Sequence, residues 1–218
     1  MAPAQEDQDP VAKEELMEDN EYDPPGRDVI LIFAVFFEGG LAPLSLLLGW
    51  LLGHHPLADF GWSLRDALLG AAAAVPLVLA FLAMMRWPIG PFRRLRKFCD
   101  EEVTPLFAES SWSEIALVSL AAGVGEEMLC RGVLQAAFCA WLGTRWGLAI
   151  SSVVFGLLHP ISIIYVAIAG FIGLYLGTIW ILNQNLLTVM VTHAVYDFAA
   201  LGYLIRIRAG DGFTNDVD

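Results

Sequence analysis

The sequence is poor in charge. Only 17% of its 218 residues are charged and 57% are apolar, whereas soluble domains usually contain about 25% charged and about 45–50% apolar residues. The mean hydropathy is +0.61. This composition excludes an ordinary soluble domain and indicates a membrane protein.

A basic surface is also missing. The net charge is −12, and ten of the 24 acidic residues lie within the first 28 positions. Nucleic-acid binding needs clustered basic residues, so that function is excluded. Residues 1–27 are too polar to bury a core and are predicted to form a disordered acidic cytoplasmic tail. Residues 206–218 are predicted to form a polar C-terminal tail.

Cysteine pairs and several protease signatures are absent. The three cysteines, Cys99, Cys130 and Cys139, are odd in number and form no CxxC pair, so neither a disulfide framework nor a zinc ribbon is expected. The sequence contains no HExxH and no GxSxG, which argues against zincins and nucleophile-elbow hydrolases. Tyr196-Asp197 resembles the YD pair of aspartyl intramembrane proteases, but a second intramembrane Asp is lacking.

Long apolar runs make up most of the remaining chain. A helix of about 20 apolar residues is long enough to cross the hydrocarbon core of a bilayer. The predicted spans cover residues 29–52, 67–87, 114–142, 146–159, 161–182 and 186–204. The fourth rises only about 21 Å, so it is expected to be shielded inside the bundle. The predicted fold is all-α, a polytopic transmembrane helix bundle of about six spans within residues 28–205.

The segment 91–112 has a different pattern. Apolar residues including Phe92 and Phe98 recur at helical spacing between basic residues, which predicts an interfacial amphipathic helix. Ser111 and Glu114 match a capping box and predict the start of the third span. With the N-terminus inside, nine Lys and Arg residues lie in inside segments and two in outside loops. This asymmetry predicts that both termini are cytoplasmic.

Ionisable residues at membrane depth are costly and are a functional signal. Glu127 and Arg131, four residues apart, share a helix face and can pair, whereas Glu126 is rotated by about 100° and has no local partner. An unpaired carboxylate in a low-dielectric site suits general-base catalysis. The simpler interpretation of Glu127 and Arg131 is an ion pair that joins helices, but it leaves Glu126 unexplained.

The later spans carry three more such residues. His159 ends the fourth span, and His193 and Asp197 share one face of the last span. Each of them alone is compatible with a purely structural role, but together with the glutamates they favour a site. Glu38, on the first span, is the outlier, and it is expected to hydrogen-bond into the bundle or to lie near an interface.

Three patterns follow one another on successive spans, and together they resemble a known family. The patterns are EExxxR (Glu126, Glu127, Arg131), FxxxH (Phe155, His159) and HxxxN/D (His193, Asp197). They resemble the CAAX protease and bacteriocin-processing (CPBP, or Abi) family, which includes the type II CAAX prenyl endopeptidases. The resemblance covers residues 114–205 and implies an intramembrane endopeptidase.

The resemblance also implies roles for these residues. Glu126 and His159 would activate a water molecule, and His193 and Asp197 would face the oxyanion or orient its donors. Glu127, Arg131 and Phe155 would support the site. The family position of Asp197 is often Asn, which donates a hydrogen bond while neutral, so Asp197 either carries a proton or orients His193.

Two chemical mechanisms stay open at the level of sequence. Direct activation of water by Glu126 needs no cofactor, and it is the preferred interpretation. The alternative is a metalloprotease in which Glu126, His159 and His193 hold one zinc ion.

The resemblance further implies a partner and a location. The expected substrate is a membrane protein or lipidated peptide, of CAAX type or with a leader peptide, in the lipid bilayer. The compact chain is closer to bacterial members, which predicts a bacterial plasma (inner) membrane.

Two other classes of protein also use ionisable residues within membrane helices or retain such a fold. A proton- or metal-coupled transporter also uses intramembrane Glu, His and Asp, but the paired broken helices of inverted repeats are missing. A non-proteolytic membrane scaffold or immunity protein has no need of the complete set of buried charges.

Overall fold

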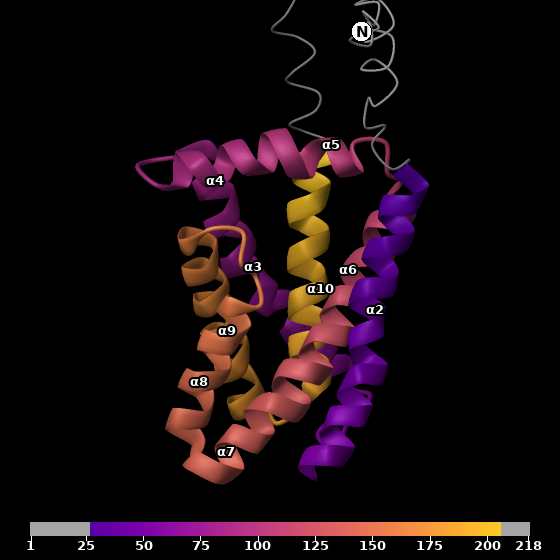
Figure 1. The fold of residues 1–218 in the computed structure, drawn as a ribbon, viewed down its shortest axis with the longest axis vertical. Helices are drawn as coiled ribbons and strands as arrows, with labels where there is room; N and C mark the ends of the chain where they lie inside the picture. Colours follow the sequence, from indigo (N-terminus) through magenta and orange to yellow (C-terminus); the bar gives the residue numbers. More distant parts are fainter. Residues whose placement is uncertain (1–26, 206–218) are drawn as a thin grey trace, which may run out of the picture.

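The computed structural model describes residues 27–205, and every regular element within that range is a helix. The fold class predicted from the sequence, an all-α membrane helix bundle, is confirmed (Figure 1). The two predicted tails lie outside the described residues, apart from Arg27, which begins the first helix.

The first two long helices form an antiparallel pair of passes through the bundle. Helix α2 (Arg27–Leu52) runs from the upper end in Figure 1 to the lower end, and α3 (Leu64–Arg86) returns to the upper end. Three short helices then lie across that upper end: α4 (Phe92–Phe98), η1 (Cys99–Val103) and α5 (Thr104–Phe107). These three short helices occupy the segment for which a single interfacial helix is predicted, and α4 carries its basic residues; we call them the interfacial layer.

The third pass is one continuous helical path of changing geometry. It comprises α6 (Trp112–Glu127), the π-helix η2 (Met128–Gln135) and α7 (Ala136–Leu142). The capping box at its start is present: Ser111 N donates to Glu114 Oε2 at 2.7 Å, and Glu114 N donates to Ser111 Oγ at 3.3 Å. The cap stabilises the first turn where the chain leaves the interfacial layer.

The last three helices complete the bundle. Helix α8 (Thr144–Leu157) rises part of the way, α9 (Ile163–Asn183) descends, and α10 (Leu186–Tyr203) returns to the upper end. The first residue of α2 and the last of α10 therefore lie at the same end of the bundle, beside the α4–α5 layer (Figure 1).

Within residues 27–205, four helices are long and apolar enough to cross a membrane, namely α2 from Asp28 onwards, α3, α9 and α10. These helices indicate an integral membrane protein. The other two predicted spans fall outside that group for physical reasons. The path α6–η2–α7 carries the charged residues, and α8 has 14 residues, which rise only about 21 Å. The count of six is therefore approximate.

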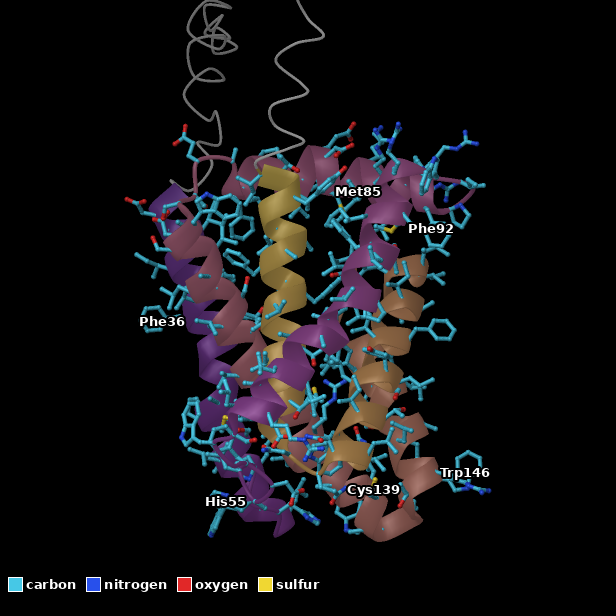
Figure 2. The ribbon with its side chains drawn as sticks, turned by 180° about the vertical axis from the view of Figure 1, so that it is seen from behind. Phe36, His55, Met85, Phe92, Cys139 and Trp146 are labelled. Carbon is cyan, nitrogen blue, oxygen red and sulfur yellow. The ribbon has the colours of Figure 1, made fainter. Side chains whose placement is uncertain are left out.

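Large apolar side chains cover the outside of the bundle. Phe36 and Trp146 are exposed and point away from the helices in Figure 2. His55 and Cys139 lie at the opposite end of the bundle from Met85 and Phe92 in the same view. Such an apolar exterior suits contact with lipid rather than water.

Helices α2 and α6 approach each other closely at one glycine. A Cβ atom built on Gly125 would overlap the backbone carbonyl oxygen of Glu38, and it would also press on Leu41. Only glycine allows this approach, and the contact places Glu38 directly beside the residue that follows Gly125, Glu126.

Candidate active site

The site is built where α6 changes into the π-helix η2. Glu127 is the last residue of α6, and Arg131 lies in the π-helical segment. The helical spacing predicted their pair but not the change in helix geometry. Single π-helical turns within α-helices are frequent at functional sites, because they alter the direction of the side chains on either side.

Three fully or nearly fully buried side chains form what we call the buried charge cluster: Glu127, Arg131 and His193. Glu127 Oε1 accepts hydrogen bonds from Arg131 Nη1 at 2.7 Å and from His193 Nδ1 at 2.8 Å. The exposed fractions of the three side chains are 0%, 2% and 7%. The cluster joins α6 and η2 to α10, and within it Glu127 is fully shielded from solvent.

Arg131 has two further partners that hold it in place. Its Nη2 donates to the carbonyl oxygen of Gly173 on α9 at 3.0 Å, and its guanidinium lies 4.5 Å from the ring centroid of Phe155 on α8. Hydrogen bonds and a cation–π contact thus stabilise a buried cation that would otherwise be very costly. Arg131 thus contacts both of the other residues predicted from the sequence to support the site, Glu127 and Phe155.

Glu126 points to a different environment. It lines a cavity of about 340 Å³ together with Glu38, His159, His193 and Asp197. The rest of the lining is mostly apolar and includes Phe81, Leu95, Phe98, Val103, Val118, Ile161 and Leu204. Because Leu95, Phe98 and Val103 belong to α4 and η1, the cavity reaches from the ionisable residues to the interfacial layer.

His159 lies opposite Glu126 across part of this cavity. Its Nε2 is 3.8 Å from Glu126 Oε2, which is longer than a direct hydrogen bond. Its Nδ1 is 2.8 Å from the carbonyl oxygen of Phe155. A carbonyl oxygen can only accept, so Nδ1 carries the proton, and in the neutral ring Nε2 faces Glu126 as an acceptor.

His193 lies between two carboxylates. Its Nδ1 donates to Glu127, and its Nε2 is 3.4 Å from Asp197 Oδ2. Asp197 is 26% exposed and lines the cavity, whereas Glu127 is sealed. His193 therefore connects the buried charge cluster to the cavity.

The four residues singled out as catalytic from the sequence, Glu126, His159, His193 and Asp197, all line this one cavity. The sequence did not assign Glu38 to it, although a single carboxylate in an otherwise apolar first span was a visible signal. Tyr165 and Tyr196 also line the cavity and were missed, because tyrosine is common in membrane helices.

The described side chains do not fit the zinc alternative. Within residues 27–205, no three His, Cys, Asp or Glu side chains are placed to hold a metal ion. Both ring nitrogens of His193 already face carboxylates, and Nδ1 of His159 is bound to a backbone carbonyl. A catalytic zinc ion needs three ligand atoms about 2.0–2.2 Å from one point.

Cys99, on the interfacial layer, also lines the cavity. Burial raises the pKa of its thiol to about 11. The thiol therefore stays protonated at neutral pH, and Cys99 is unsuited to be a nucleophile.

Residues 108–199 match a family model described as "Type II CAAX prenyl endopeptidase Rce1-like". The match contains all three patterns, from Glu126 to Asp197, and confirms the assignment of this segment to the CAAX protease family. No curated protein and no solved structure matches the chain. The family is one of proteases, and together with the four apolar helices it indicates an integral membrane enzyme that acts on membrane-associated protein.

Proposed function

We propose that the chain is an intramembrane endopeptidase in which Glu126 and His159 activate the water that attacks a peptide bond. The observation that carries the proposal is the 3.8 Å separation of Glu126 Oε2 and His159 Nε2 inside a cavity. A water molecule can bridge two acceptors at this separation and donate one proton to each.

This arrangement suits a general-base reaction. Glu126 accepts a proton from the water as the water oxygen attacks the scissile carbonyl carbon. Nε2 of His159 accepts a hydrogen bond from the other O–H group of the water and so orients it. The hydrogen bond from Nδ1 to Phe155 keeps the ring in the tautomer that this task requires. The negative charge then develops on the former carbonyl oxygen.

His193 is the proposed donor to that oxyanion. Since Nδ1 already donates to Glu127, a proton on Nε2 makes the ring cationic, and the carboxylates of Glu127 and Asp197 stabilise that charge. In this role Asp197 orients His193 and need not donate a hydrogen bond itself.

The proposed substrate is a membrane protein or lipidated peptide of CAAX or leader type. The apolar lining of the cavity suits an apolar chain better than a free polar peptide. Entry is proposed from the end of the bundle that holds α4 and η1. The basic residues of α4 support a cytoplasmic position for that end. The membrane is proposed to be a bacterial plasma membrane.

The proposal is tested with purified protein in detergent and a quenched fluorescent peptide that ends in a farnesylated CAAX sequence. Wild-type protein and Glu102→Gln, the same chemical change at an exposed residue, are expected to cleave it, whereas Glu126→Gln is not. If wild type and Glu126→Gln cleave equally well, the proposed mechanism is wrong.

Two further measurements address substrates and alternatives. Terminal mass spectrometry of membrane proteins, compared between cells with wild type and with Glu126→Gln, identifies natural cleavage products. Ion flux in liposomes that Glu126→Gln abolishes, without peptide cleavage by wild type, would favour a transporter.

A further inference from the structure

Among the described residues, Glu38 carries the one carboxyl group of the cavity that the proposed reaction does not use. It lies in the middle of α2, where its backbone carbonyl packs against Gly125 of α6. Its side chain lines the cavity together with Glu126. Its place on the first helix is outside the family match, which begins at residue 108.

Two features of the Glu38 carboxyl group define what it can do. Its carboxyl lies within hydrogen-bonding reach of the Glu126 carboxyl. Its Oε2 is buried and has no hydrogen-bond partner among the described residues. A hydrogen bond between two carboxyls requires a proton on one of them, since a carboxylate has no donor. A proton shared by Glu38 and Glu126 would lie in the cavity, next to the atoms that react.

Peptide hydrolysis needs such a proton. The attack forms a C–O bond with the water oxygen, and the C–N bond then breaks only if the leaving nitrogen receives a proton, because an amide anion is a very poor leaving group. His159 Nε2 is 3.8 Å from Glu126 Oε2, where the water is proposed to bind, and Glu38 lines the same cavity.

We propose, resting on the function proposed above, that Glu38 is a further catalytic residue, the acid that protonates the leaving nitrogen. Glu126 takes one proton from the water, and Glu38 gives its own proton to the nitrogen as the C–N bond breaks. The products are a carboxylic acid and an amine. The proton on Glu126 then moves to Glu38 along the hydrogen bond between them, which restores the starting state.

The test compares two substrates that differ in the leaving group. One is the farnesylated fluorescent peptide, and the other is the same molecule with an ester in place of the scissile amide. An alkoxide leaves far more readily than an amide anion, so ester cleavage depends much less on the acid. Glu38→Gln keeps the size of the side chain and a hydrogen bond to Glu126 but has no acidic proton to give.

The expected result for Glu38→Gln is a fall in kcat of about 10²–10⁴-fold on the amide and less than about tenfold on the ester, with KM nearly unchanged. Ser45→Ala, which removes a buried hydroxyl two turns further along α2, is the matched control and is expected to behave as wild type on both. Glu126→Gln is expected to lose activity on both substrates.

Three outcomes would overturn the inference. Equal losses on amide and ester would show that Glu38 only positions Glu126, and unchanged amide cleavage would show that Glu126 alone serves as base and acid. If wild type cleaves neither substrate, the proposed function fails as well. Glu38→Asp keeps the acid on a shorter side chain and is expected to cleave the amide at least tenfold faster than Glu38→Gln. If Glu38→Gln does not purify folded, as judged by its melting temperature, Glu38→Met, which also lacks an acidic proton, takes its place in the comparison of the two substrates.

Discussion

Glu126 and Glu127 are adjacent and chemically identical, yet they lie in opposite environments. Glu127 is fully buried, and a single oxygen of its carboxylate binds both Arg131 and His193. Glu126 is 14% exposed, faces a cavity and has His159 opposite it at 3.8 Å. The rotation of about 100° between neighbours on a helix separates a structural carboxylate from one that is open to a substrate.

The difference shows how one helix seals one carboxylate in the bundle and turns the next towards a cavity. The buried charge cluster ties four helical segments together and fixes the direction of α6 at its last turn. Glu126 is left facing the cavity, with His159 Nε2 at 3.8 Å from its carboxylate. Changes on the two sides should therefore affect different properties.

The largest effect is expected from Glu126→Gln. The amide has the same shape but cannot accept a proton, so kcat should fall by about 10³–10⁴-fold. The melting temperature in detergent should stay close to that of wild type, because Glu126 is outside the buried charge cluster. A large loss of stability together with activity would mean that the two carboxylates are not separate in function.

Arg131→Met should lower the stability of the protein, by a free energy nearly as large as the effect of Glu126→Gln on catalysis. The change leaves Glu127 buried without its main cation, at an expected cost of about 3–5 kcal/mol of unfolding free energy. Denaturant titration in detergent measures it, and Arg145→Met, at an exposed residue, is the control. A variant as stable as wild type would show that Arg131 does not stabilise the fold.

Gly125→Ala tests the contact that places Glu38 beside Glu126. The added Cβ would overlap the carbonyl oxygen of Glu38, so α2 must move away, at a cost of about 1–3 kcal/mol. Peptide cleavage should fall as well, because the two carboxyls separate. Gly39→Ala adds the same methyl group on α2 where nothing lies within 4 Å, so it should lower neither stability nor cleavage.

Asp197→Asn should have the smallest effect. The amide oxygen of Asn can still accept from His193 Nε2, which lies 3.4 Å from Asp197 Oδ2, so kcat should stay within about tenfold of wild type. Asp197→Ala, which removes the acceptor, should lose more. If Asn and Ala are equally impaired, the charge of Asp197 rather than its hydrogen bond is required.

Helix limits were highly predictable from local patterns. The apolar run 186–204 corresponds to α10 at Leu186–Tyr203, and the capping box at Ser111 marks the start of α6. Apolar length, proline and capping residues act within a few residues along the chain, so they can be read without the fold. The π-helical segment after Glu127 could not be predicted in this way, because packing against neighbouring helices decides where it forms.

The sequence by itself determined the membrane bundle and the family resemblance of its C-terminal half, and it singled out Glu126, His159, His193 and Asp197, which line one cavity. It even separated Glu126 from Glu127, because helical geometry alone turns adjacent side chains apart. Only the tertiary structure decided that His193 binds Glu127 and that Glu38 joins Glu126 in the cavity. Those contacts connect residues 66 and 88 positions apart, and the physical reason lies in how the helices pack: one glycine that admits a close approach and one buried arginine that holds three other helices around it.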